Sequence, residues 1–401
     1  MLRTLLDYIA VIGQTFKREF QLIFSDSAVY SSYIGATLLV GFLYSYIYSH
    51  ENIVNLSVVV VDQDQTQMSH KIIRMIDATQ QVKVEYSAPN LEAAQHLFDY
   101  GKVKGIIVIP HDFSRKLQQG NVPSVSVYCD ASYMLYYKQM LTSVTTSVGT
   151  FSAEVEVNKM MGGGLPQRQA IASRRPIETI SKPLFNLNGG YGTFLMPIVF
   201  LVAVQTLQIS AMGVMGGTQR ERGIYNQLYP FVRRRLGTIP VLLGRSGVYL
   251  LISSFLMFIQ IGIVMTVFDF PQRGNPWEVM IFLIPFILSV TFLGITLMNL
   301  FKHREDALMT VTISSIPSLF LCGVSWPAIA FPEWIKSISY LFPTTLGVKG
   351  FMEMTQFGAS LSEIKKVWME LWGICLFYFI LAAMTLKRLS IVNLGKEKTS
   401  K

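Results

Sequence analysis

The sequence has 401 residues, of which 51% are hydrophobic and only 15% are charged, and its formal net charge is +9. So low a charged fraction argues against a soluble protein. The positive net charge would suggest nucleic acid as a partner only in a soluble chain, so no nucleic-acid partner is expected. The three cysteines, Cys129, Cys322 and Cys375, have no metal-ligand spacing and do not suggest a disulfide framework.

Residues 1–27 are predicted to form an amphipathic helix. Apolar side chains recur at spacings of three and four residues, and polar residues that include Lys17 and Arg18 fill the other face. Because an apolar run follows at once, the pattern favours a helix that lies along the membrane surface over a soluble core helix.

Six apolar runs each approach the ~20 residues that cross a bilayer. They are Ala28–Tyr48, Tyr191–Thr218, Ser246–Phe268, Val279–Phe301, Ala307–Ala330 and Val367–Leu386. The first run ends in a poor cleavage site, so residues 28–48 are expected to remain as a transmembrane helix. Spans two to six are expected within residues 191–390, and residues 391–401 form a tail.

Residues 49–190 form a polar insert in which short apolar runs alternate with amphipathic segments. Strands are predicted at Leu56–Val61, Val82–Tyr86, Gly105–Ile109 and Val125–Cys129, and helices at Gln65–Ala78, Leu91–Tyr100, Asp112–Gln118 and Tyr133–Met161. This alternation indicates an α/β domain whose sheet is covered by helices. The last helix could form a stalk or a dimer contact, and the sequence does not decide between them.

Lys and Arg near the span ends predict the orientation. With the N-terminus in the cytoplasm, the inside segments hold sixteen of these residues and the short outside loops hold five. Long translocated domains are exempt from this rule. Both termini are therefore expected in the cytoplasm, and the insert 49–190 is expected outside.

The largest predicted cytoplasmic loop, residues 217–245, combines charge with apolar side chains. It contains Arg220, Glu221, Arg222 and Gly223, then Gln227, and three further arginines at positions 233–235. Arginines alone would only hold the loop inside. The acidic Glu221 and the apolar residues between the arginines favour a docking surface for a soluble partner.

A proline-rich stretch, residues 326–345, precedes the last span. It contains Trp326, Pro327, Phe331, Pro332, Trp334 and Pro343. These prolines cannot lie inside one continuous helix, yet the surroundings are as apolar as a span. Two interpretations remain open: a re-entrant segment at the outer end of a transport pathway, which protein or water must cover, or an interfacial loop in the aromatic belt.

Gln205 and Gln208 are polar residues inside the second predicted span. Such residues face a bundle interior or a cavity, so they can line a pathway or join helices by hydrogen bonds.

The sequence resembles the membrane subunit of an ABC-2 type exporter, in the subgroup with a large extracytoplasmic insert after the first span. The entry helix with Lys17-Arg18-Glu19-Phe20, the Glu221-Arg222-Gly223 loop with Gln227, and the Trp326–Pro343 stretch carry the resemblance, as do Val61-Asp62 and Gly105–Pro110 in the insert. The likeness covers nearly the whole chain. Ile224 departs from it, since the family usually has Thr there.

The resemblance implies a fold, a site and partners. The fold is an α-helical membrane protein with six transmembrane helices, an amphipathic N-terminal helix, a re-entrant segment before the last span and an inserted α/β domain. Lys17, Arg18, Glu19, Arg220, Glu221, Arg222, Gly223 and Gln227 would couple to an ATPase subunit. The Trp326–Pro343 stretch would form the outer gate of the pathway. Gln205 and Gln208 stay candidates for lining that pathway on the ground of their polarity alone.

The implied protein is an exporter subunit of the bacterial inner membrane that pairs with a second permease subunit, identical or not. A periplasmic adaptor or an outer-membrane channel is left open as a further partner. The sequence contains no G-x-x-x-x-G-K-[ST] loop. ATP and Mg²⁺ are therefore expected on a partner ATPase, with no cofactor on this chain.

Two other functions are compatible with parts of the sequence. A membrane receptor would use the insert to bind a ligand. A membrane-anchored phosphatase would use Asp62 and Asp64, which follow a predicted strand as in the D-x-D-x-T nucleophile loop. No downstream acidic pair suited to holding Mg²⁺ follows, so a capping role for Asp64 or Thr66 is the simpler interpretation. The five scattered histidines do not suggest a metal site.

Overall fold

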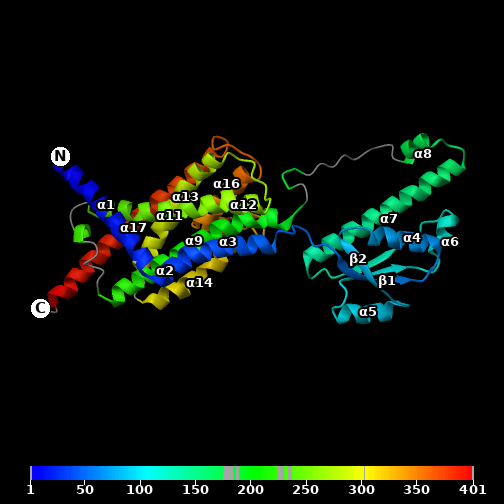
Figure 1. The fold of residues 1–401 in the computed structure, drawn as a ribbon, viewed down its shortest axis with the longest axis horizontal. Coiled ribbons are helices and arrows are strands. Elements are labelled where there is room, and N and C mark those ends of the chain that lie inside the picture. The colour runs from blue at the N-terminus through cyan, green and yellow to red at the C-terminus, as the bar shows by residue number, and fades with distance from the viewer. Residues whose placement is uncertain are drawn as a thin grey trace. The chain divides into compact units, whose positions relative to one another are not determined.

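The computed structural model describes residues 2–174, 184–186, 189–223, 230–233, 237–301 and 303–399. The chain forms two compact units (Figure 1). The insert unit comprises Asn52–Lys182, and the helical unit comprises Met1–Glu51 and Pro183–Lys401.

The insert unit contains a four-stranded sheet in the order β2-β1-β3-β4. Its strands are β1 (Leu56–Asp62), β2 (Val82–Ser87), β3 (Gly105–Ile109) and β4 (Ser126–Cys129). β1 pairs in parallel with β2 and β3, and β4 runs antiparallel to β3. A parallel central strand is buried on both faces, which explains why β1 is a continuous run of valines rather than an alternating pattern.

Helices cover both faces of this sheet, as the sequence pattern predicts (Figure 1). The insert helices are α4 (Gln67–Asp77), α5 (Leu91–Asp99), α6 (Phe113–Gln118), α7 (Met134–Gly162) and α8 (Gln167–Arg174). Val58 and Val60 of β1 pack with α4 and α7, whereas Val59 and Val61 pack with α5. Successive side chains of a strand point to opposite faces, so one strand serves two cores.

Asp62 and Asp64 hold the loop after β1. The Asp62 carboxylate accepts backbone N–H bonds from Asp64 and Gln65 at 3.1 and 3.0 Å. Thr66 caps α4 through a reciprocal pair of bonds with Ser69. The described residues of this loop thus fit the capping role, and both carboxylates are used as hydrogen-bond acceptors.

Asp64 also joins this loop to α6. Its carboxylate accepts bonds from the Ser114 backbone N–H, the Ser114 hydroxyl and the Thr66 hydroxyl. Burial alone would raise the pKa of Asp64, but these hydrogen bonds outweigh burial and hold the pKa below its usual value.

The helical unit begins with the amphipathic helix α1 (Leu2–Ser25). A continuous helix then follows through α2 (Ser27–Tyr30), a π-helical turn at Ser31–Gly35 and α3 (Ala36–Ile47). Asp26 separates the two by capping α2, since its carboxylate accepts the Ala28 N–H at 3.0 Å. The predicted boundary between the surface helix and the first span therefore lies at a helix cap.

The remaining helices follow the insert. They are α9 (Tyr191–Glu221), α11 (Thr238–Ile259) with α12 (Met265–Val267), α13 (Pro276–Met298), α14 (Arg304–Leu321), α15 (Glu333–Ser339), α16 (Pro343–Thr355) and α17 (Lys365–Thr399). A π-helical turn at Gln260–Val264 joins α11 to α12 without a break.

Five helices in the described part of the chain are long and apolar enough to cross a membrane. They are Ser27–Ile47, Tyr191–Glu221, Thr238–Val267, Pro276–Met298 and Lys365–Leu389, and they coincide with five of the six predicted spans. The sixth, predicted at 307–330, corresponds to α14. This helix has 18 residues, or ~27 Å at 1.5 Å per residue. It begins with three charged residues, so six spans remain a prediction.

The core of the helical unit includes α16, a helix that the sequence did not reveal. It packs against α9, α13 and α17 and carries buried Leu346, Phe351 and Met354. Gly347 and Gly350 face Phe286 and Phe282 of α13, and a Cβ at either glycine would overlap a ring. Small residues at this crossing let the two backbones approach closely.

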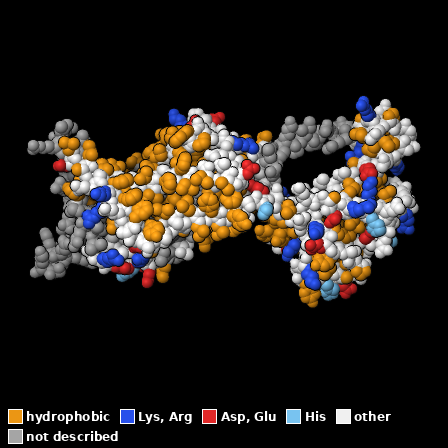
Figure 2. Space-filling view, in the orientation of Figure 1, with side chains coloured by type: hydrophobic (Ala, Val, Ile, Leu, Met, Phe, Trp, Pro, Cys, Tyr) orange, Lys and Arg blue, Asp and Glu red, His pale blue; other side chains and the backbone are white. Residues whose placement is uncertain are grey.

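The surface of the helical unit is apolar over a broad band. Figure 2 shows hydrophobic side chains covering much of the visible face of this unit. Large exposed apolar residues lie on its long helices, including Leu39, Phe42, Leu251, Phe255, Phe258, Leu376, Ile380 and Met384. A band this extensive is typical of a surface that contacts lipid. The start of α1 and the end of α17 lie at the same end of the unit (Figure 1).

Asp64→Asn is expected to destabilise the insert unit by about 1–2 kcal/mol at pH 7, because the Ser114 and Thr66 donors lose a charged acceptor. Since the folded pKa of Asp64 is depressed, the stabilisation is present at neutral pH and is lost as the pH falls through that pKa. Thermal unfolding of residues 52–182 by circular dichroism at pH 7 and pH 3 measures both effects.

The matched control is Asp99→Asn, which removes an exposed aspartate from the end of α5. Equal melting temperatures for Asp64→Asn and Asp99→Asn at pH 7 would contradict this account of the loop.

Candidate functional site

The entry helix α1 is anchored to α11 by a buried ion pair. Arg245 donates from Nε and Nη2 to Oε1 of Glu19 at 3.0 and 2.8 Å, and the Tyr249 hydroxyl donates to the same oxygen at 3.1 Å. Both charged side chains have no exposed surface. Two charges buried in this way stabilise each other only while both partners are present.

The local sequence explains why Glu19 is buried. Val11, Thr15, Glu19 and Ile23 are four residues apart and are the buried stripe of α1. Opposite this stripe, a Cβ on Gly244 of α11 would overlap Thr15, so the helices can meet only because the residue is glycine. The apolar periodicity of α1 identified the helix but not which face is buried.

The three predicted coupling residues of α1 therefore differ in position. Lys17 is exposed, Arg18 is half-buried and Glu19 is fully buried. Glu19 contacts Arg245 and Tyr249 of α11. A direct contact between Glu19 and a soluble partner would require this ion pair to open. In the described structure, Glu19 therefore anchors α1 to α11.

The end of α9 forms a second polar cluster, which we call the elbow cluster: Asp26, Arg220, Glu221, Asn299 and Arg304. Glu221 accepts the backbone N–H of Arg304, the first residue of α14, at 2.9 Å. Arg220 donates to the Asn299 carbonyl at the end of α13. The Arg304 guanidinium lies 3.8 Å from the Asp26 carboxylate. The cluster thus joins the ends of α1, α9, α13 and α14.

A glycine ends α9 at this cluster. Gly223 has φ +65°, and its N–H bonds to the Arg220 carbonyl at 2.9 Å. A left-handed residue after the last turn closes a helix, and glycine adopts that conformation without strain. Arg222 and Gly223 are both exposed next to this stop. Gln227 lies outside the described residues.

Gln205 and Gln208 both join helices. Gln208 donates to Thr291 of α13 at 2.7 Å and accepts from Ser253 of α11 at 2.7 Å. Gln205 donates to Ser318 of α14 at 2.7 Å and accepts the Thr344 N–H of α16 at 3.1 Å. Hydrogen bonds of this kind hold helices together in an apolar surrounding.

Gln205 also lines a cavity of about 360 Å³. Its neighbours there include Ser318, Leu341 and Tyr378. At Gln205, helix joining and pathway lining are therefore compatible. At Gln208, the observed contacts join helices.

The proline-rich stretch forms short helical turns before α16. A turn of 3₁₀-helix at Ala328–Ala330 and the short α15 replace a continuous helix. Trp326, Pro327, Pro332 and Trp334 are exposed, and Phe331 is half-buried. Pro343 is buried at the first position of α16, where its missing N–H costs nothing.

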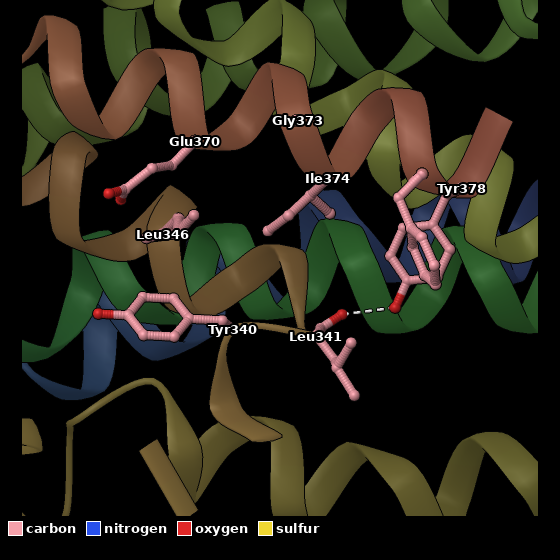
Figure 3. Close-up of a pocket in the computed structure, with 8 residues that line it drawn as sticks. Tyr340, Leu341, Leu346, Glu370, Gly373, Ile374 and Tyr378 are labelled. Atoms are coloured by element: carbon pink, nitrogen blue, oxygen red, sulfur yellow. Dashed lines mark hydrogen bonds between the residues drawn. The ribbon is translucent and has the colours of Figure 1, made fainter. Parts of the chain in front are cut away.

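A groove lies between this stretch and α17 (Figure 3). It has a volume of about 480 Å³, and its walls include Tyr340, Leu346, Ile374 and Glu370. The Tyr378 hydroxyl donates to the Leu341 carbonyl at 2.6 Å, at the end of the groove away from Glu370 (Figure 3). Leu341 and Tyr378 also line the 360 Å³ cavity, so the groove and the cavity share a wall.

Comparison with known proteins gives the family. A model of the ABC-2 family transporter proteins matches residues 28–384, which is most of the chain. The chain belongs to the ABC-2 transporter family. Its members are membrane subunits of transporters rather than enzymes, and they work with ABC ATPase partners. The chain is thus a multi-pass membrane permease subunit of an ABC transporter, as the resemblance implied.

Two curated relatives align over most of their length. The chain is 23% identical over 384 residues to the linearmycin resistance permease protein LnrN of Bacillus subtilis (strain 168), covering 92% of this chain and 95% of that protein. It is 19% identical over 327 residues to the probable multidrug ABC transporter permease YbhR of Escherichia coli (strain K12), covering 80% and 82%.

Arg245→Met is expected to lower the free energy of unfolding by about 3–5 kcal/mol, because it leaves the Glu19 carboxylate buried without its guanidinium. Adding Glu19→Gln should restore most of the loss, since the uncompensated charge is then gone. Thermal unfolding of the detergent-purified chain, followed by tryptophan fluorescence, measures both variants.

Lys17→Met removes an exposed charge from the same helix and is the control, with an expected change near zero. Additive losses in the Glu19→Gln, Arg245→Met double variant would show that the two side chains act independently.

Proposed function

We propose that this chain is the permease subunit of an ATP-driven exporter that moves a substrate out of the cytoplasm or the inner leaflet. A separate ATPase subunit binds ATP and Mg²⁺ and docks at the elbow cluster. Its closure on nucleotide displaces the end of α9, and the helices alternate between inward and outward access.

The bond between Glu221 and the first backbone N–H of α14 carries this proposal. It ties the exposed acidic end of α9 to a second helix, so a force applied at Glu221 reaches α14 directly. Ser318 of α14 in turn bonds to Gln205 of α9 and to Thr344 of α16. A chain of hydrogen bonds therefore connects the proposed docking end with the helix that follows the proline-rich stretch.

We further propose that both termini and the elbow cluster face the cytoplasm of a bacterium and that the insert faces outward. The excess of Lys and Arg in the predicted inside segments supports this orientation. The start of α1 and the end of α17 lie at the same end of the helical unit (Figure 1). This placement is consistent with two cytoplasmic termini, because an even number of crossings returns the chain to the side on which it started.

Efflux of toxic small molecules is the proposed role. The relatives are called a linearmycin resistance permease and a probable multidrug permease, which supports this class of substrate without naming one. A second permease subunit is proposed as a partner, and an adaptor or outer-membrane channel stays open. Affinity purification of the full chain, with identification of a co-purifying ATPase and its ATP hydrolysis, tests the assembly.

Glu221→Ala combined with Arg222→Ala is expected to lower ATP-driven transport by about tenfold or more while membrane insertion stays intact. The substitutions remove a charged acceptor at the start of α14 and an exposed cation beside it. Substrate flux in proteoliposomes that contain the chain and its ATPase measures the effect.

Glu221→Gln keeps an acceptor oxygen for Arg304 and should be less severe. Glu305→Gln removes an exposed carboxylate from the same helix start and is the charge control. Normal transport and normal ATPase association in the double alanine variant would count against the proposed docking site.

Trp326→Ala is expected to change the transport rate several-fold with little change in assembly. The side chain is 60% exposed in the stretch proposed as the outer gate, so its loss removes little core packing. Initial rates of export, compared with the amount of assembled complex, measure the effect. Unchanged kinetics would reduce Trp326 to an interfacial aromatic residue.

A further inference from the structure

Among the described residues that line the groove between the proline-rich stretch and α17, one side chain is charged. Glu370 extends from α17, and its carboxylate lies on the same side of the groove as the Tyr340 hydroxyl (Figure 3). The remaining walls are aliphatic or aromatic, including Ile374, Phe377 and Tyr378. The groove therefore combines one carboxylate with an extensive apolar lining.

Glu370 forms no ion pair with any Lys, Arg or His in the described part of the chain. It is half-buried, and it belongs to one of the five helices that can cross a membrane. Glu370 lies in the second turn of that helix, one turn after the exposed Lys365 and Lys366. Carboxylates in membrane-spanning helices pair with an opposite charge or mark a substrate pathway. Since no ion-pair partner of Glu370 lies among the described residues, a ligand of opposite charge would complete the pair.

The lining sets a second requirement for that ligand. Tyr340 and Phe377 are 41% and 51% exposed, so both rings offer contact surface to a molecule in the groove. Aromatic faces attract cations, and the aliphatic walls favour an apolar body. An anion of the same shape would be repelled by Glu370 and would leave the carboxylate without a counter-charge.

The groove also adjoins a second cavity. Leu341 and Tyr378 line both the groove and the cavity that Gln205 lines. Tyr378 lies two helical turns beyond Glu370, or ~12 Å along the axis at 1.5 Å per residue. The Tyr378 hydroxyl donates to the Leu341 carbonyl at this shared wall.

We propose that this groove binds a lipophilic cation, with the positive centre against the Glu370 carboxylate and the apolar body between α16 and α17. The proposal rests on the proposed exporter function, because it names the substrate class that such an exporter would carry. The same chemistry could come from a free amine or onium ion, or from the amine of phosphatidylethanolamine.

The test measures binding of radiolabelled tetraphenylphosphonium to the purified full-length chain in dodecyl maltoside by equilibrium dialysis, without ATP. Tetraphenylborate is the matched probe, since it has nearly the same size and shape but the opposite charge. The wild-type chain is expected to bind the phosphonium and not the borate.

Three variants locate the site. Glu370→Gln should weaken phosphonium binding about tenfold or more, because it removes the counter-charge. Gly373→Leu should weaken it as well, because no atom lies within 4 Å of a Cβ at Gly373 and the new side chain would enter the groove. Glu363→Gln is the control: it removes an exposed carboxylate shortly before α17 while keeping an acceptor for Ser360.

Equal binding by wild type, Glu370→Gln and Glu363→Gln would overturn the proposal, as would equal binding of phosphonium and borate. Displacement of the phosphonium by phosphatidylethanolamine, but not by free amines, would assign the groove to a lipid and overturn its assignment to a soluble cation. Because the measurement needs no ATPase, failure here leaves the exporter proposal intact. Failure of ATPase association would leave a positive binding result intact.

Discussion

The helical unit depends on the requirement that polar groups inside an apolar bundle find partners within the chain. α9 meets this requirement for several helices at once. Gln208 bonds to α11 and α13, Gln205 bonds to α14 and α16, and Glu221 bonds to the start of α14. Unpaired amides here would be expensive, so these contacts fix the relative position of the helices around α9 more strongly than apolar packing alone.

Local patterns in the sequence predicted the elements but not their long-range contacts. The strand at Gly105–Ile109 and the helix cap at Thr66 follow from residues within a few positions, and both are observed. The contact between Glu19 and Arg245 joins residues 226 positions apart. No periodicity encodes such a pair, although a carboxylate on the apolar stripe of α1 and an arginine in an apolar run are the signals that could have suggested it.

α16 was missed for a related reason. Lys349 and Glu353 interrupt its apolar pattern, so the sequence does not resemble a span, and the predicted re-entrant region stops at residue 345. The helix is nevertheless buried because Gly347 and Gly350 allow close contact with Phe286 and Phe282 of α13. Tertiary packing, not local hydrophobicity, decides its place. The elbow cluster was found in part: Glu221 was identified from its motif, while its partner Arg304 lies 83 positions away.

The two proposed sites lie on one connected framework. α14 begins at the elbow cluster and carries Ser318, which contacts Gln205 and Thr344. Thr344 lies in the first turn of α16, next to Leu341, whose carbonyl accepts the Tyr378 hydroxyl. A small displacement of α14 relative to α9 would therefore move the wall that the groove shares with the cavity lined by Gln205. Packed helix contacts tend to have discrete arrangements rather than to deform continuously, so a movement at Glu221 would be expected to shift that wall from one arrangement to another. The bond between Tyr378 and Leu341 lies at that wall, and Leu341 belongs to the stretch proposed above as the outer gate, so the proposed gate and the groove share this contact.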